Sequence, residues 1–397
     1  MTFSSVFQST LSALGFGALG YLVFLGLLTV PFFQDQAIYL HGVTLTWFKD
    51  VSIAEQWGFL RNQVTPFTLR TPDGVTLHAW HIFPLGLYRR HEDELIKQPE
   101  GIAVDVTDRT SFKLLRDDPE ALLVLYLHGA AGTLGSGWRP PSYRAMSAGA
   151  PDKIHTVAID YRGFGASTGY PSEQGLLTDA VTLAEWAMRE AGIPPSRIVI
   201  FGQSLGTAVG ISLAHYYASK PTPTSFAGMV LVAPFADVEL LTATYRIAGT
   251  VPILGPLSPF PRLLAFLNTF ILSKWPSKDK LAAFVRECEE RPGDDGKYHV
   301  TIIHAQDDYD IPWSHSDQLF WHAVNASRPD GITFDDLEEE KEQTKKTLGP
   351  AGWVAESRTA RGIVREEIAK WGLHDRIMSY PIVSLAVLRT FEASGAI

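Results

Sequence analysis

The chain opens on a long apolar stretch. No charged side chain occurs before Asp35, and residues 11–33, LSALGFGALGYLVFLGLLTVPFF, are mostly apolar. A helix of that length would extend about 35 Å, enough to cross a bilayer core with some tilt. A cleaved signal peptide is the alternative, but no Lys or Arg precedes the run and no A-x-A site follows it. The sequence therefore predicts a single-pass membrane anchor over residues 1–34.

Beyond this block, the apolar positions fall into short runs. Residues 64–85 alternate on both sides of Pro72-Asp73-Gly74, which is typical of a β-hairpin. The polar stretch from Tyr88 to Asp118 predicts an exposed excursion. Continuous apolar runs, which are typical of strands buried on both faces of a parallel sheet, follow at residues 122–127, 155–165, 196–202, 228–235 and 299–308.

Helical segments separate these runs. Residues 172–192 begin at the capping residue Ser172 and stop at Gly192, and residues 204–219 form a second segment. Strands that alternate with helices predict an α/β fold with a mostly parallel, doubly wound sheet. Active sites of such sheets lie at the carboxyl ends of the strands. We therefore expect one catalytic domain over residues 64–397, joined to the anchor by a membrane-proximal linker over residues 35–63.

Two insertions interrupt the alternation. The first, at about 235–298, is rich in proline and then places apolar side chains at helical spacing around Phe266 and Phe270. This helix is too short to span a bilayer, so we expect a cap over the sheet or a helix in the membrane interface. Phe266 and Phe270 are the predicted substrate-binding residues. The second insertion, at about 327–349, has mixed charges that indicate a solvated helix face.

Composition narrows the classes of partner. Hydrophobic residues make up 46% and charged residues 19% of the chain, which fits a globular core and excludes wholesale disorder. The formal net charge is −9, and no basic cluster exceeds a pair such as Arg89-Arg90, so a nucleic-acid partner is not expected. The one cysteine, Cys288, has charged neighbours in a predicted helix and is expected to be structural or exposed. The oligomeric state stays open.

Candidate chemistry centres on a G-x-S-x-G pattern that occurs twice. Around Ser204, Gly202 ends a predicted strand and a helix begins at the serine, the sharp turn that exposes a nucleophilic hydroxyl. A serine needs such a turn, a base and oxyanion donors before it can attack. Ser167 follows its strand at a distance and precedes Pro171 without a helix, so it is expected to be a loop residue. Ser204 is the predicted nucleophile.

An acid and a histidine should follow the serine along the chain. Asp307, Asp308 and Asp310 stand at the end of the fifth strand; a divalent metal is the alternative for such carboxylates, but no further ligand motif accompanies them. His374 lies in a loop and is the predicted base. His315 and His322 sit on a predicted helix and are expected to pack or to be exposed.

The remaining parts of the site come from backbone and from the absence of cofactor motifs. Two backbone N–H groups are needed for the oxyanion, and Leu205 and Ala130, the latter in the loop HGAAG, are the predicted donors. The formal G-x-G-x-x-G of residues 15–20 has no preceding strand and is a decoy. His78 and His81, three apart on a strand, point to opposite faces and cannot share an ion. We expect neither a cofactor nor a metal.

With these residues in place, the chain resembles the α/β-hydrolase superfamily, and within it the membrane-anchored monoacylglycerol and lysophospholipid lipases of the α/β-hydrolase domain-containing 12 type. The similarity is carried by LYLHGAAGT, IDYRGFGASTGYPSEQGL, FGQSLGTAVG, LVAPF, IIHAQDDYDIP and GLHD. The resemblance implies that the acid is Asp308, ahead of the pair Ile311-Pro312. It also implies an endoplasmic-reticulum location with a lumenal catalytic domain. The chain departs from the pattern at Gln203, where such lipases often have His.

Three hypotheses of function remain in order. The first is a membrane-anchored serine hydrolase that cleaves carboxylic esters of lipids through an acyl-enzyme on Ser204, with His374 and Asp308 completing the triad. The second is an acyl-protein thioesterase. The third, from another class, is a non-catalytic binding protein on a hydrolase fold.

Overall fold

The computed structural model of the protein describes residues 3–247, 251–252, 254–257, 259–291 and 297–397. Its main element is a sheet with the strand order β1-β2-β4-β3-β5-β6-β9-β12-β11-β10. The strands of this sheet are β1 (Val64–Arg70), β2 (Thr76–Ile82), β3 (Leu122–Leu127), β4 (Ile154–Ile159), β5 (Ile198–Gln203), β6 (Gly228–Val232), β9 (Tyr298–Ala305), β10 (Lys346–Thr347), β11 (Gly352–Arg358) and β12 (Gly362–Ala369). The strands from β4 to β12 in this order are parallel, and both margins are antiparallel.

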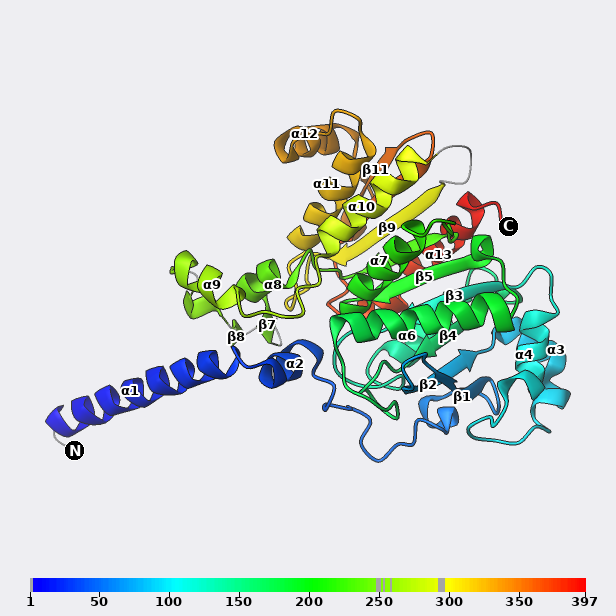
Figure 1. The fold of residues 1–397 in the computed structure, drawn as a ribbon, viewed down its shortest axis with the longest axis horizontal. Coiled ribbons are helices and arrows are strands. Elements are labelled where there is room, and N and C mark those ends of the chain that lie inside the picture. Colours follow the sequence, from blue (N-terminus) through cyan, green and yellow to red (C-terminus); the bar gives the residue numbers. More distant parts are fainter. Residues whose placement is uncertain (1–2, 248–250, 253, 258, 292–296) are drawn as a thin grey trace.

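Helices cover both faces of the sheet (Figure 1), with α6, α7 and α10 on the near face and α13 behind. The helices are α1 (Phe3–Leu27), α2 (Pro31–Tyr39), α3 (Leu85–Leu95), α4 (Thr110–Arg116), α5 (Arg139–Met146), α6 (Glu173–Glu185), α7 (Leu205–Ala218), α8 (Val238–Thr244), α9 (Pro261–Asn268), α10 (Ser277–Glu290), α11 (Ser314–Ser327), α12 (Phe334–Thr344) and α13 (Pro381–Ala393). A short hairpin of β7 (Arg246–Ile247) and β8 (Val251–Pro252) lies outside the main sheet.

Burial on both faces explains why the central strands are continuously apolar. Along β3, Leu123, Leu125 and Leu127 enter one core cluster, together with residues of α6, α7 and α10. The alternate residues Leu122 and Val124 enter the other cluster, together with residues of α5 and α13. Successive side chains of a strand point to opposite faces, so a strand between two helix layers needs apolar residues at every position. The predicted doubly wound α/β sheet is confirmed.

Several predicted elements need correction. The stretch from residue 88 to 118 is not an exposed excursion, because it contains α3 and α4, and Tyr88, Leu95 and Phe112 are buried. The strands β11 and β12 were not predicted at all. The charged insertion does form a helix, α12, but one of its cations, Lys341, is buried against the carboxylates of Asp317 (2.7 Å) and Glu366 (3.3 Å).

The predicted anchor is one long helix followed by a short one. Within the described residues, Gln8–Leu27 is the one helical stretch long and apolar enough to cross a membrane, and α1 extends away from the rest of the protein (Figure 1). The chain breaks after Leu27 and resumes as α2 at Pro31, so the apolar run of residues 11–33 is not a single helix. Near the break, Leu25 packs against Leu254 and Leu257 of the first insertion.

Candidate active site

Ser204 stands on a sharp turn between β5 and α7. Its backbone is in a strained left-handed conformation, with φ at 52°. The flanking glycines are required by contacts: a Cβ on Gly202 would lie 2.4 Å from the carbonyl oxygen of Gly206, and a Cβ on Gly206 would lie 1.9 Å from that of Leu127. Both separations are far below van der Waals contact, so only glycine lets the turn close. Backbone strain of this kind concentrates at functional sites.

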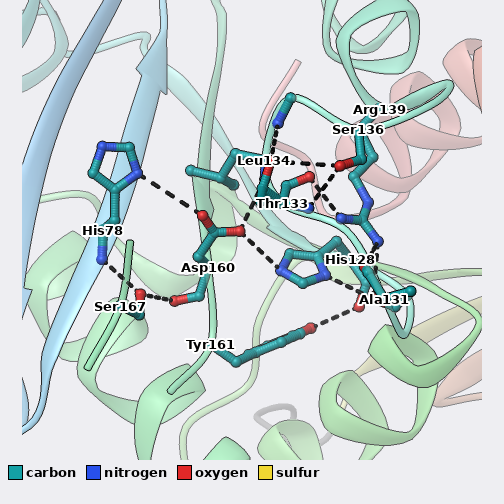
Figure 2. Close-up of polar contacts among 12 residues, drawn as sticks. His78, His128, Ala131, Thr133, Leu134, Ser136, Arg139, Asp160, Tyr161 and Ser167 are labelled. Atoms are coloured by element: carbon teal, nitrogen blue, oxygen red, sulfur yellow. Dashed lines mark hydrogen bonds and ion pairs between the residues drawn. The ribbon is translucent and has the colours of Figure 1, made fainter. Parts of the chain in front are cut away.

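The two candidate serines differ in what their hydroxyl groups do. Among the described residues, no hydrogen bond engages the Ser204 hydroxyl. The Ser167 hydroxyl, by contrast, donates to the Asp160 carbonyl (2.6 Å) and accepts from the His78 backbone N–H (2.8 Å), as Figure 2 shows. Ser167 therefore fastens the loop after β4 to β2. The expectation that Ser167 is a loop residue agrees with this geometry.

The acid and the histidine proposed for the site are in direct contact. His374 Nδ1 lies 2.7 Å from Asp308 Oδ2. The other oxygen, Asp308 Oδ1, accepts the backbone N–H groups of Asp310 (2.9 Å) and Ile311 (3.0 Å). His304 Nε2 also lies 3.0 Å from Asp308 Oδ2. These donors fix the carboxylate so that one oxygen faces His374.

The other two aspartates have different surroundings. Asp307 accepts the N–H groups of Gly372 and Leu373, each at 2.8 Å, and so holds the loop that carries His374. Carboxylate or imidazole atoms of Asp308, Asp310 and His374 lie within 4.8 Å of one another, a spacing that could suit a metal ion. The lone pairs of Asp308, however, already accept N–H donors from both histidines and from the backbone, which fits a hydrogen-bonding role.

A side chain beside the predicted nucleophile reaches the histidine loop. Gln203 Nε2 donates to the carbonyl oxygen of His374 (3.4 Å) and to Asp375 Oδ1 (3.2 Å). Since Gln203 directly precedes Ser204, this link fixes the turn and the histidine loop next to each other. Sequence analysis noted Gln203 only as a departure from the family pattern and gave it no role.

Charge and burial act in opposite directions on the acid–base pair. Burial alone would lower the pKa of His374, but the charge and hydrogen bond of Asp308 outweigh it and raise that pKa to about 9. Burial alone would raise the pKa of Asp308, but the charge of His374 and the hydrogen bonds from His304 and His374 hold it well below its usual range. The carboxylate is therefore ionised, and it favours the proton on His374 Nδ1.

The glycine-rich loop after β3 lies against the serine turn. A Cβ on Gly129 would be 3.2 Å from Ser204 Cβ and 2.4 Å from Gln203 Oε1, so only glycine allows this approach. The buried Arg139 donates to the Gly129 carbonyl through Nη2 (3.0 Å). In a trans peptide the C=O of one residue and the N–H of the next point in opposite directions. The Ala130 N–H is therefore directed away from Arg139.

Leu205 is the first residue of α7, so its N–H has no acceptor within the helix. Ala130 and Leu205, the predicted oxyanion donors, thus lie on two segments that meet at Ser204. Arg139 itself was missed, because a lone arginine on a helix carries no sequence signal of its target.

A buried polar network supports the loop from behind (Figure 2). His128 Nδ1 donates to the Gly129 carbonyl (2.7 Å), and its Nε2 lies 3.5 Å from Asp160. Asp160 also accepts the Leu134 N–H (2.8 Å), and the Tyr161 hydroxyl donates to the His128 carbonyl (3.1 Å). Burial lowers the pKa of His128. This network was not predicted from the sequence.

Histidines that were set aside lie in structural environments. His78 faces Asp160, whereas His81 contacts His155 (3.0 Å), so the two strand histidines do point to different partners. His315 is buried and contacts the Thr244 hydroxyl (2.9 Å), and burial lowers its pKa to about 4. Cys288 is likewise buried, and burial raises the pKa of its thiol to about 12.

The two phenylalanines predicted to bind substrate lie on the first insertion. Phe266 is 57% and Phe270 38% exposed, and their rings meet edge to face at 5.3 Å. Phe266 belongs to α9, but the helix ends at Asn268, so Phe270 lies in the following turn. On the other side of α9, Leu264 and Leu267 pack against the cluster that contains Leu25 of α1. Their place beside the anchor is clear, and a substrate role stays a prediction.

Comparisons with known proteins agree with this geometry. A model described as "Alpha/beta hydrolase family" matches residues 124–362, more than half of the chain. "Lysophosphatidylserine lipase ABHD12" from Danio rerio is 27% identical over 301 residues, which cover 76% of this chain and 69% of the relative. "Protein ABHD12B" from Homo sapiens is 29% identical over 312 residues, covering 77% and 72%.

A solved structure shows the same fold at lower sequence similarity. The alpha-beta hydrolase from Vibrio vulnificus has a TM-score of 0.54 and 16% identity, and the match covers 92% of this chain and 94% of that one. The relatives confirm the resemblance to the α/β-hydrolase domain-containing 12 type that the motifs indicated. By its fold, its matched residues and its relatives, the chain belongs to the alpha/beta hydrolase family.

Proposed function

We propose that this chain is a membrane-anchored serine hydrolase that cleaves carboxylic esters of lipids, with monoacylglycerols and lysophospholipids as the substrate class. One observation carries the proposal: an ionised Asp308 holds His374 at 2.7 Å in a loop that is tied by Gln203 to the strained turn of Ser204. The relatives named lysophosphatidylserine lipases support an ester of a single-chain lipid as substrate.

The reaction follows from the roles of these groups. Ser204 Oγ attacks the acyl carbonyl carbon while His374 Nε2 takes its proton, and Asp308 keeps the other ring nitrogen protonated. The N–H groups of Ala130 and Leu205 stabilise the negative oxygen of the tetrahedral intermediate. His374 then protonates the leaving alcohol. Water, deprotonated by His374, hydrolyses the acyl-serine and releases the fatty acid.

The N-terminal helix supports action at a membrane. We propose α1 as a single-pass anchor, with the catalytic domain from residue 64 onward and the segment of residues 35–63 next to the membrane. The exposed Phe266 and Phe270 beside α1 support a role for the first insertion in receiving the acyl chain at the bilayer interface. The endoplasmic reticulum is the location that the family resemblance implies for this anchor.

The experiment that tests the function compares the two motif serines. Ser204→Ala should abolish hydrolysis of lysophosphatidylserine and monoacylglycerol, with a loss on the order of 10⁴ or more in rate, because the nucleophile is gone. Ser167→Ala, the matched control, should keep activity and instead lower the Tm, because it loses two buried hydrogen bonds. Full activity in Ser204→Ala would contradict the proposal.

The same protein separates the competing functions. A fluorophosphonate probe should label the parent protein on Ser204. Hydrolysis of acyl-protein thioesters without hydrolysis of lipid esters would identify a thioesterase instead. Absence of both labelling and turnover in a folded parent protein would identify a non-catalytic binding protein.

A further inference from the structure

The segment between the anchor and the first strand lies directly on the oxyanion loop. Residues 34–44, from here on the strap, comprise most of α2 and the turn that follows it. The strap's Tyr39 carbonyl accepts the Ala131 N–H (2.9 Å), and its Val43 carbonyl accepts the Gly132 N–H (2.6 Å). The strap is thus a hydrogen-bonded neighbour of the loop and not a free linker.

A third contact extends this pairing. The Ser136 hydroxyl donates to the carbonyl of Thr44 (2.7 Å) and accepts the N–H of Thr133 (2.7 Å). Three successive N–H groups of the loop, those of residues 131 to 133, are therefore satisfied directly by the strap or by a hydroxyl that the strap holds. Among the described residues, the Ala130 N–H has no such acceptor, so it is the loop donor left for the substrate.

The loop cannot adopt this shape by local preference alone. Ala131 has a φ of 55°, in the left-handed region that a non-glycine residue adopts only when its surroundings compensate. On the opposite side, Arg139 donates to the carbonyls of Gly129 (3.0 Å) and Ala131 (2.7 Å), as seen for Ala131 in Figure 2. The loop is held between the guanidinium of Arg139, which takes carbonyls, and the strap, which takes N–H groups.

The other edge of the strap is fastened to the first insertion. The Tyr39 side chain is fully buried, and its hydroxyl donates to Ser273 Oγ (2.9 Å). Gln34 makes a pair of bonds across the same boundary: its Nε2 donates to the Phe270 carbonyl (2.7 Å), and its Oε1 accepts the Leu272 N–H (3.2 Å). The strap therefore bridges the oxyanion loop and the segment that carries Phe270.

We infer that residues 34–44 are a positioning element of the reaction: their backbone carbonyls at Tyr39, Val43 and Thr44 hold the oxyanion loop so that only the Ala130 N–H faces the acyl oxygen. The inference rests on the proposed esterase function and adds to it a segment from outside the matched hydrolase region. Because the strap follows α1 directly, the part of the chain that leaves the membrane also completes the active site.

The test uses full-length protein in detergent and two kinds of variant. Tyr39→Ala removes the side chain that anchors the strap, and Ser136→Ala removes the tie to Thr44 with little change in volume. Tyr39→Phe is the matched control, since it keeps the ring and the backbone carbonyl and loses only the bond to Ser273. A Gly-Gly insertion between Thr29 and Val30 is the second control, because it lengthens the connection to α1 and leaves the strap in place.

Two readouts separate positioning from general support of the fold. The first is hydrogen–deuterium exchange of the amides of residues 131–133, which does not depend on turnover; it should accelerate in Tyr39→Ala and Ser136→Ala and stay parental in both controls. The second is kcat/KM for an ester and for the matching thionoester, whose sulfur gains less from oxyanion donors. Hydrolysis of the ester should fall on the order of 10²-fold, the cost of one misplaced donor, and hydrolysis of the thionoester much less.

The outcomes decide between the alternatives. Unchanged amide exchange in both strap variants overturns the inference, and so does an equal loss on ester and thionoester at a parental Tm. If Tyr39→Ala does not fold, the milder Ser136→Ala variant decides. A parent protein that hydrolyses no ester refutes the proposed function, whereas the amide exchange still judges the strap.

Discussion

Asp308→Asn changes one oxygen of the acid–base pair into an NH2 group. The asparagine Oδ1 can still accept the N–H groups of Asp310 and Ile311, so the backbone turn should persist. The new NH2 group then faces His374 Nδ1, which must accept its proton and carry its own proton on Nε2. That tautomer cannot take the Ser204 proton, and a wrong tautomer alone costs about 10⁴ in rate.

The same substitution removes the charge that keeps His374 basic. The pKa of His374 is about 9 because Asp308 overcomes the effect of burial; without that charge it should fall to the ordinary 6.5 or below. The shift is at least about 2.5 pH units, or about 3.4 kcal/mol at 1.36 kcal/mol per unit. Since only neutral His374 can act as base, kcat/KM of the parent should rise with pH until about 9, and the residual activity of the variant should level off by about 6.5.

The assay is kcat/KM for a short soluble ester between pH 5 and 10, with rates corrected for spontaneous hydrolysis. Asp310→Asn is the matched control, because Asp310 makes the smallest of the contributions that raise the pKa of His374. It should keep most of the activity and nearly the parental pH profile. The reasoning is refuted if the acid limb of Asp308→Asn stays where it is in the parent, or if Asp310→Asn is the inactive variant.

Three further predictions concern the surface, the interior and the anchor. Phe266→Asp combined with Phe270→Asp should sharply reduce hydrolysis of long-chain monoacyl esters and little affect p-nitrophenyl acetate, since each buried CH2 of substrate is worth about 0.8 kcal/mol; an equal loss on both esters at a parental Tm would contradict this. Burial lowers the pKa of His81 to about 3 and of His315 to about 4, so the unfolded chain binds more protons below pH 6.5, and the Tm should fall between pH 7 and pH 5. Deletion of residues 1–28 should release an active enzyme from carbonate-washed membranes, and continued sedimentation would mean that another segment anchors it.

Local sequence signals predicted the elements whose geometry is local. The serine turn, the central strands and the hairpin at Asp73 each depend on residues that are close together in the chain, and these elements lie where the pattern indicated. The strands β11 and β12 escaped prediction because they are rich in charge. Arg365 on β12 is satisfied by Glu356 on the neighbouring strand (3.1 Å) and by Glu367, a pairing that exists only once the strands are side by side.

The site shows the same division. The residues alone left three aspartates open, and only the folded structure separates Asp308, which contacts His374, from Asp307, which holds the loop. Arg139 and the strap could not be recognised, because what they bind is the backbone of residues 129–132, and backbone acceptors leave no mark in a sequence. The apolar run that predicted the anchor also concealed the start of α2 at Pro31.

Gln203 gives the joint between the serine turn and the histidine loop a property that a histidine at this position would lack. Its amide donates to the His374 carbonyl and to Asp375, and an amide neither gains nor loses a proton between acidic and alkaline pH. An imidazole in its place would change charge near neutrality and pull differently on Asp375 in each state. The alignment of nucleophile and base is therefore insensitive to the acidity of the compartment, and the rate should respond to pH through His374 alone until the buried histidines unfold the domain.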